Sequence, residues 1–142
     1  MSIAKIEDAK KVTTYDPDKN VNGSLVELYK DGDKTVAYLT SVKQGMFKGY
    51  HLHRVRAARY APLKGKMKII LYRPGSNEKE EYILDAENPQ RLFIPKDIAT
   101  GLECIGNEEA WLINYPNPPY DPSLKDEQVE YTEEELEKGI VK

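Results

Sequence analysis

Short runs of apolar and β-branched residues, separated by turn residues, follow one another from about residue 24 to residue 115. No stretch of about twelve residues in this region repeats with the period of an amphipathic helix. The runs predict β-strands, with Gly, Pro, Asn and Asp between them as boundaries. The predicted strands are 24–29, 35–42, 50–55, 59–63, 67–72, 80–84, 90–94, 101–105 and 110–115. Eight or nine short strands in one chain are typical of a jelly roll, so the pattern predicts an all-β fold.

Two segments near the C-terminus break the strand pattern. Residues 114–122 contain four prolines and must leave the sheet, because proline has no N–H to donate to a strand ladder. Further on, Thr132 and Glu135 have the spacing of a capping box, which predicts a short helix that ends near Gly139. We therefore expect one domain over residues 1–142, with a core at about 22–115, a Pro-rich strap at 116–122 and an acidic helical segment at 132–139.

The composition adds expectations about where the protein works. The sequence has no run of about 18 apolar residues, and charges begin at Lys5, so it predicts neither a membrane span nor a secretion signal. The single cysteine, Cys104, lies between the apolar residues Leu102 and Ile105 and is expected to be a core residue in a reducing compartment. We therefore expect a cytoplasmic protein that does not contact a membrane.

The formal net charge of −3 hides an uneven distribution along the chain. Nine basic residues and no acid lie between residues 43 and 73, whereas eight acids lie between residues 121 and 137. Each charge taken alone fits a solvated surface. Taken together, the basic segment favours a small anion such as a sugar diphosphate. Nucleic acid is not expected as a partner, because the sequence pI of about 5.5 is acidic.

The only two histidines, His51 and His53, are two residues apart on a predicted strand, so both side chains point to the same side. We expect that side to be the barrel interior. Such a pair can bind a metal, transfer protons, or simply be hydrogen-bonded polar groups in a half-buried cavity. A neutral imidazole has a pKa of about 6.5 and can remove a proton beside a carbonyl if the resulting enolate is stabilised. The cations that could hold a diphosphate or the enolate are Lys48, Arg54, Arg56 and Arg59.

Several stretches resemble the dTDP-4-dehydrorhamnose 3,5-epimerases and their shorter cupin relatives, the dTDP-4-keto-6-deoxyhexose 3,4-ketoisomerases. They are residues 22–28, 43–53, 63–72, 91–101 and 120–122, within a likeness that covers about residues 22–131. The resemblance implies a cupin-type jelly-roll barrel with a short C-terminal helix. It also implies a homodimer, in which a partner covers the exposed early strands.

The resemblance also implies roles for individual residues. His51 matches the histidine that removes a proton beside the C4 ketone, Lys48 matches a basic residue associated with the substrate, and Tyr120 matches the tyrosine that acts as acid on the other face of the sugar. His53 is expected to be a neighbour of the base or a substrate contact, and Arg59 an anion contact. Metal-binding cupins add a Glu and a third His. Residues 55–63 contain no acid and Thr100 occupies the place of that His, so neither a metal nor a cofactor is expected.

These observations lead to one leading hypothesis and two rivals. The leading hypothesis is an epimerase or isomerase that acts on a nucleotide-linked, dTDP-type 4-keto-deoxy sugar through an enolate, with a small-molecule nucleotide sugar as its partner. The alternative is a non-catalytic cupin that binds a sugar nucleotide or another small anion, which Thr100 and Pro119 favour because relatives often carry His and Tyr there. A third possibility is a metal-binding cupin that uses His51 and His53 with acids from elsewhere.

Overall fold

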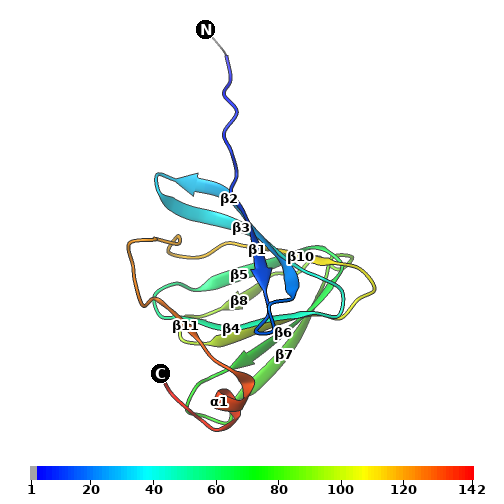
Figure 1. The fold of residues 1–142 in the computed structure, drawn as a ribbon, viewed down its shortest axis with the longest axis vertical. Helices are drawn as coiled ribbons and strands as arrows, with labels where there is room; N and C mark the ends of the chain where they lie inside the picture. The colour runs from blue at the N-terminus through cyan, green and yellow to red at the C-terminus, as the bar shows by residue number, and fades with distance from the viewer. Residues whose placement is uncertain (1–2) are drawn as a thin grey trace.

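The computed structural model describes residues 3–142 and consists almost entirely of strands (Figure 1). The strands are β1 (Lys11–Tyr15), β2 (Val21–Asp31), β3 (Lys34–Val42), β4 (Phe47–His53), β5 (Ala58–Lys64), β6 (Lys66–Tyr72), β7 (Lys79–Asp85), β8 (Leu92–Ile94), β9 (Ala99–Cys104), β10 (Ala110–Asn114) and β11 (Gln128–Glu130), followed by the helix α1 (Glu133–Glu137). This element order confirms the predicted all-β jelly-roll class with a short C-terminal helix.

The strands form two antiparallel sheets. Sheet A has the order β1-β2-β3-β10-β5-β8, and sheet B has the order β11-β4-β9-β6-β7. The main core lies between the sheets and includes the fully buried side chains of Val42, Met67, Ile69 and Leu112. Cys104 belongs to the same core, as the sequence predicts, and its thiol donates to the carbonyl of Glu108.

Each strand predicted from the sequence overlaps a strand of the structure, but β1 and β11 were not predicted. Both are edge strands, and most of their side chains are exposed. An edge strand of this kind has no buried face, and therefore its sequence shows no alternation of apolar and polar residues. β11 also lies only a few residues after the Pro-rich strap, where the sequence gives no reason to expect a return to the sheet.

The outward face of sheet B carries a second apolar cluster, which the C-terminal segment covers. Tyr50 and Leu52 of β4 point into this cluster and pack with Tyr131 and with Leu136 of α1. Thr132 caps the helix through the predicted capping box, since its side chain accepts from the N–H of Glu135 and the Glu135 carboxylate accepts from the N–H of Thr132. Side chains alternate between the two faces of a strand. Because Tyr50 and Leu52 point outward, their neighbours His51 and His53 point into the space between the sheets.

The Pro-rich strap is tied to the body of the molecule. Asn117 pairs with Ala57 and Tyr120 pairs with Thr35 through isolated β-bridges, and the strap then leads to β11. β11 lies antiparallel to β4, with Gln128 opposite His53 and Glu130 opposite His51. The ladder continues one residue further, where the N–H of Arg54 donates to the carbonyl of Glu127 at 2.8 Å. The strap therefore places the residues around Glu127 beside β4, the strand that contains both histidines.

Residues 3–9, which precede β1, extend away from the sheets as an arm (Figure 1). Ile3 and Ile6 on this arm are fully exposed, and β1 forms an outer edge of sheet A. Nowhere within residues 3–142 is a helix long and apolar enough to cross a membrane.

Candidate active site

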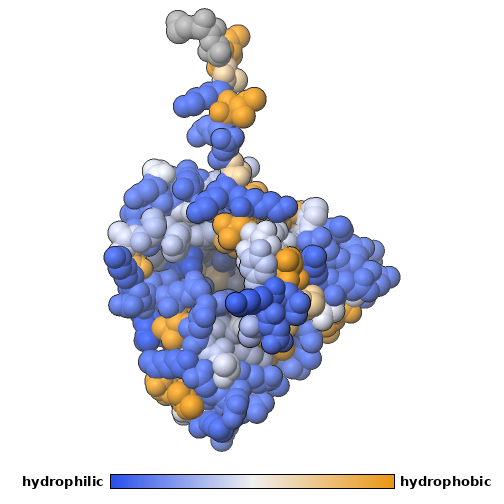
Figure 2. Space-filling view, in the orientation of Figure 1, coloured by the Kyte–Doolittle hydropathy of each residue, from blue (hydrophilic) through white to orange (hydrophobic). Residues whose placement is uncertain are grey.

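A cavity of about 420 Å³ lies between the two sheets. Figure 2 shows a hollow near the centre of the viewed face, with mostly hydrophilic residues around it. Sheet B and the connections beside it contribute Lys48, His51, His53, Arg56, Thr100 and Gln128 to the cavity wall. Sheet A and the strap contribute Glu27, Tyr38, Thr40, Tyr60, Asn114 and Tyr120. The volume is in the range of small-molecule sites, and the mixed lining suits a ligand with several polar groups.

Lys48 and His51 both face this cavity although they are three residues apart on β4. The register between β4 and β9 shifts between these two residues, and such an irregularity changes which face of the strand a side chain occupies. The Lys48 side chain is buried, and its ammonium donates to the carbonyl of Ser24 at 2.9 Å. Burial lowers the pKa of Lys48 to about 8. Lys48 therefore carries a positive charge at neutral pH but can lose it under mildly alkaline conditions.

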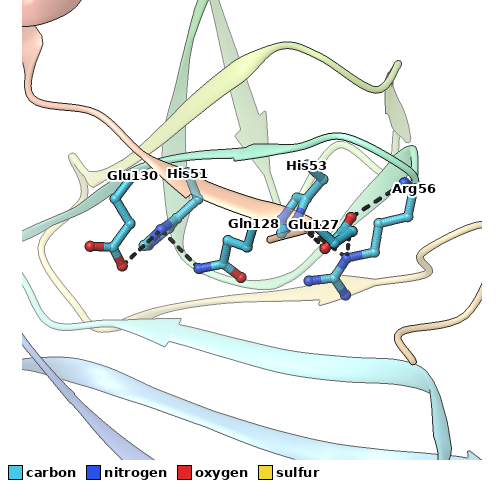
Figure 3. A network of polar contacts seen from close by, with 6 residues as sticks. All are labelled: His51, His53, Arg56, Glu127, Gln128 and Glu130. Carbon is cyan, nitrogen blue, oxygen red and sulfur yellow. Dashed lines mark hydrogen bonds and ion pairs between the residues drawn. The ribbon is translucent and has the colours of Figure 1, made fainter. Parts of the chain in front are cut away.

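His51 is held from the side of β11 (Figure 3). Its Nδ1 lies 3.2 Å from the side-chain amide nitrogen of Gln128 and 3.7 Å from a carboxylate oxygen of Glu130. With Nδ1 facing β11, Nε2 is the ring nitrogen left for the cavity. Burial lowers the pKa of His51 below its usual value, the Glu130 charge opposes this shift, and the charges of Lys48 and Arg56 add to it, so the imidazole is neutral at pH 7.

His53 has a more buried set of partners (Figure 3). Its Nδ1 lies 3.3 Å from Oε2 of Glu127, and the Arg56 Nε lies 3.3 Å both from that Nδ1 and from Oε1 of Glu127. The backbone N–H of Arg56 also points to Oε1 of Glu127. Burial and the positive charge of Arg56 lower the pKa of His53 to about 4 despite the nearby carboxylate. A base of such low pKa is weak, and hence His53 is better suited than His51 to orienting a ligand.

Tyrosine side chains face the histidines from the opposite side of the cavity. The rings of Tyr38 and Tyr120 lie 6.2 Å apart, and the Arg56 guanidinium stacks on Tyr120 with 4.8 Å to the ring centre. Burial raises the pKa of Tyr38, and it raises the pKa of Tyr60 to about 12. Burial thus keeps the phenols of Tyr38 and Tyr60 protonated at neutral pH, and each can donate a hydrogen bond to a ligand.

The structure brings together most of the residues that the sequence singles out. His51, His53, Lys48, Arg56 and Tyr120 all line the cavity. Two predicted cations do not. The guanidinium of Arg54 donates to the carbonyl of Lys142, and that of Arg59 stacks on the ring of Phe93. Arg59 lies between Ala58 and Tyr60, which face the cavity, and thus alternation along β5 directs it to the outer face.

Other cavity residues were not predicted from the sequence. Glu127 and Glu130 are among the eight acids between residues 121 and 137, each of which taken alone fits a solvated surface, and Gln128 has no predicted role, because nothing in the sequence shows that this segment returns to β4. The inward-facing polar side chains of Glu27, Tyr38 and Asn114 were also missed. One sequence signal does point to such residues: a polar residue at a strand position that, by the alternation of faces, should be buried and apolar. Among residues 3–142, no three or more His, Cys, Asp or Glu side chains are grouped so as to hold a metal ion.

Sequence comparisons relate most of the chain to proteins of polysaccharide synthesis. The family model described as "Polysaccharide biosynthesis C-terminal domain" matches residues 18–128. The probable low-salt glycan biosynthesis epimerase Agl13 of Haloferax volcanii is 27% identical over 118 residues, which cover 75% of this chain and 76% of that protein. The spore coat polysaccharide biosynthesis protein SpsL of Bacillus subtilis is 26% identical over 129 residues, which cover 84% of this chain and 83% of that protein.

Solved structures share the fold. The capsular polysaccharide assembling protein CapF from Staphylococcus aureus superposes with a TM-score of 0.70 at 22% identity, over 84% of this chain and 34% of CapF. This chain therefore spans about a third of the CapF chain. NovW, a 4-keto-6-deoxy sugar epimerase of Streptomyces spheroides, superposes with a TM-score of 0.61 at 17% identity, over 91% of this chain and 70% of NovW. The cupin-type barrel implied by the sequence is thus confirmed.

The buried pair of Glu127 and Arg56 gives the first prediction. Glu127→Gln leaves the Arg56 charge buried without its counter-ion, and we expect it to lower the free energy of unfolding by about 3 kcal/mol in chemical denaturation. The matched control is Glu130→Gln, since the Glu130 side chain is 77% exposed and its loss should cost about 0.5 kcal/mol or less. Equal losses in the two variants would contradict the placement of Glu127.

Proposed function

The chain belongs to the polysaccharide biosynthesis C-terminal domain family, and on that premise we propose that it is an epimerase or isomerase of a nucleotide-linked, dTDP-type 4-keto-deoxy sugar. The observation that carries the proposal is the neutral His51, whose Nδ1 contacts residues of β11 and whose ring faces a cavity that also contains Lys48 and three tyrosines, Tyr38, Tyr60 and Tyr120. The likeness to relatives named as epimerases supports the general part of this proposal, namely that the protein is a sugar epimerase of polysaccharide synthesis.

The proposed reaction uses residues from both walls of the cavity. Nε2 of His51 takes the proton from the carbon beside the C4 ketone, and the electron pair of the broken C–H bond moves to the ketone oxygen to give an enolate. The buried ammonium of Lys48 stabilises the negative charge on that oxygen. A tyrosine on the opposite wall then returns a proton to the other face of the carbon, which inverts its configuration. Tyr120 is the proposed acid, and Tyr38, whose ring lies 6.2 Å from that of Tyr120, is the second candidate.

Other cavity residues have supporting roles in this proposal. His53, fixed by Glu127, contacts the substrate as a neutral hydrogen-bonding group. Arg56 reaches the cavity from the same cluster and provides a positive charge for substrate anions. We do not extend the proposal to Arg54 and Arg59, because their guanidinium groups are engaged away from the cavity.

The alternative function is a cupin that binds a sugar nucleotide without turnover. Thr100 lies directly opposite His51 in the pairing of β4 and β9, at a cavity position where the resembled epimerases often carry a histidine. The orientation of the Gln128 amide favours this alternative, because its nitrogen lies 3.2 Å from His51 Nδ1 and can only donate; Nε2 in the cavity then holds the ring proton and does not act as a base.

We propose that the protein works in the cytoplasm on a small-molecule substrate. The buried Cys104 thiol, which donates to a backbone carbonyl, fits a reducing compartment. The cavity volume of about 420 Å³ suits a sugar ring with part of its nucleotide carrier.

The proton-transfer role of His51 gives a direct prediction. Incubated in heavy water with a dTDP-4-keto-6-deoxyhexose, the wild-type protein is expected to exchange the protons beside the ketone, followed by NMR. His51→Ala should reduce this exchange by about a thousandfold or more, because it removes the general base. Arg54→Ala is the control and should keep the wild-type rate, since Arg54 lies outside the cavity. Full exchange by His51→Ala would exclude His51 as the base.

The shifted pKa values predict how turnover depends on pH. The value of kcat/KM should fall at acidic pH as His51 is protonated, with a midpoint below 6.5, because the folded protein lowers its pKa. It should also fall as pH rises through about 8, where Lys48 loses its charge. Lys48→Arg keeps the charge at all these pH values and should remove the alkaline fall. An alkaline fall that persists unchanged in Lys48→Arg would show that Lys48 does not cause it.

We also propose that the protein is a homodimer formed through the outer face of sheet A. Trp111 and Ile113 of β10 lie on this face, and Leu63, Phe93 and Tyr115 beside them are more than half exposed. Two copies of one apolar face can cover each other about a two-fold axis. The unpaired edge of β1 and the exposed arm before it lie on the same sheet and would extend the contact.

The dimer can be checked by sedimentation. The chain has a mass of 16.2 kDa, and the expected species is about 32 kDa, twice that value. Leu63→Glu combined with Phe93→Glu should shift the protein to the monomer mass by placing charges on the contact. Ile83→Glu on sheet B is the matched control, because Ile83 is equally exposed but lies outside this face. A monomeric wild-type protein at micromolar concentration would refute the proposal.

A further inference from the structure

Three buried side-chain atoms within residues 3–142 have no hydrogen-bond partner: Oε2 of Glu27, Nη1 of Arg56 and Oδ1 of Asn114. All three residues line the same cavity. The Nζ of Lys30 lies 3.6 Å from Oε2 of Glu27, which is close enough for an ion pair but too far for a hydrogen bond. Leaving a buried polar group unpaired costs free energy, and folded proteins pair nearly all such groups. Three unpaired groups around one cavity therefore indicate that something outside the chain provides their partners.

Glu27 and Asn114 belong to a row of polar side chains on the inner face of sheet A. Glu27 on β2 lies opposite Tyr38 on β3, Tyr38 lies opposite Asn114 on β10, and Asn114 lies opposite Tyr60 on β5. Every member of this row lines the cavity. Partners in a ladder place their side chains on the same face, so the row forms a continuous polar strip across four strands. The strip faces sheet B, which carries the histidines.

The chemistry of the unpaired atoms defines what can bind there. The carboxylate oxygen of Glu27 and the amide oxygen of Asn114 need hydrogen-bond donors, whereas the guanidinium nitrogen of Arg56 needs an acceptor. Hydroxyl groups of a sugar ring provide both. Arg56 is fixed for this task, because its side chain is only 9% exposed and its Nε is held 3.3 Å from Glu127. All three atoms are screened from solvent in the free chain, and the proposal therefore requires their side chains to turn toward a bound ligand.

From this arrangement we propose that Glu27, Asn114 and Arg56 form the sugar subsite of the cavity and determine which hydroxylated ring it accepts. Glu27 and Asn114 accept from ring hydroxyls, and Arg56 donates to an oxygen of the ring or its substituents. The inference rests on the proposed function, since it assigns the groups that recognise the substrate at the same site. It separates recognition of the hydroxyls on sheet A from proton removal by His51 on sheet B.

Binding of stable nucleotide sugars tests the subsite without requiring turnover. The ligands are dTDP-glucose and UDP-glucose, each compared by calorimetry with its parent nucleotide, dTDP or UDP. The wild-type protein is expected to bind at least one sugar-bearing ligand about tenfold or more tighter than its parent, because hydrogen bonds to the sugar add to the affinity. Glu27→Gln and Asn114→Leu should each reduce that preference by about tenfold while the affinity for the parent nucleotide stays as in the wild type.

The unchanged affinity for the parent nucleotide reports that the variants are folded. The control is Glu81→Gln on β7, an exposed carboxylate that pairs with Lys68 and lies outside the cavity, and it should keep the full preference. The proposal is overturned if both cavity variants keep the wild-type preference, if they lose affinity for sugar-bearing and parent ligands alike, or if the wild-type protein shows no preference.

The heavy-water exchange of the keto sugar separates this inference from the proposed function. If the variants lose the sugar preference but the wild-type protein exchanges no protons, the subsite stands and the enzymatic proposal fails. If the wild-type protein exchanges protons and the variants keep the sugar preference, the enzymatic proposal stands and the subsite fails.

Discussion

The pairing of β11 with β4 is the constraint on which the candidate site depends. Only three residues of β11 take part, yet the pairing places Gln128 and Glu130 beside His51 and brings Glu127 to His53. Without it, β4 would be the edge strand of sheet B, and neither imidazole would have these partners. The pairing itself is held by packing on the other face of sheet B, where Tyr131 and Leu136 are buried against Tyr50 and Leu52. The apolar C-terminal anchor and the polar site are therefore parts of one arrangement.

The cavity combines two walls of different chemical character. Sheet B presents imidazoles that are neutral because burial lowers their pKa values, and a buried ammonium whose lowered pKa of about 8 still leaves it charged at neutral pH. Sheet A presents protonated phenols, since burial raises the pKa of Tyr38 and Tyr60, and two hydrogen-bond acceptors, Oε2 of Glu27 and Oδ1 of Asn114, that have no hydrogen-bond partner. Inversion of a carbon through an enolate uses a base on one face of the substrate and an acid on the other. The separation of the two sets by a cavity fits that requirement.

The sequence predicts the fold well because the central strands are buried on at least one face, and their sequences therefore carry apolar residues at the buried positions. The two histidines could be placed in the interior for the same reason, since residues two apart on a strand share a face. Glu127 could not be found in this way, because it lies 74 residues from its partner His53 and reaches it after a strap that the prolines remove from the sheet. Arg59 is the opposite case, a residue that is near the histidines in the sequence but not in the structure. It lies close to the histidines in sequence, but alternation along β5 turns it to the outer face, against Phe93.

The central claim is that contacts on the β11 side of His51 keep its cavity nitrogen free to take a proton. Proton–nitrogen correlation NMR of the imidazoles at neutral pH tests it most directly, since the nitrogen shifts show which ring atom carries the proton. The account predicts a protonated Nδ1 that points toward the Glu130 carboxylate 3.7 Å away, with the Gln128 amide turned over so that its oxygen faces the ring in place of its nitrogen, and an unprotonated Nε2 in the cavity. A protonated Nε2, with Nδ1 accepting from the Gln128 amide, would contradict the account, because His51 could then donate a proton to a ligand but not remove one.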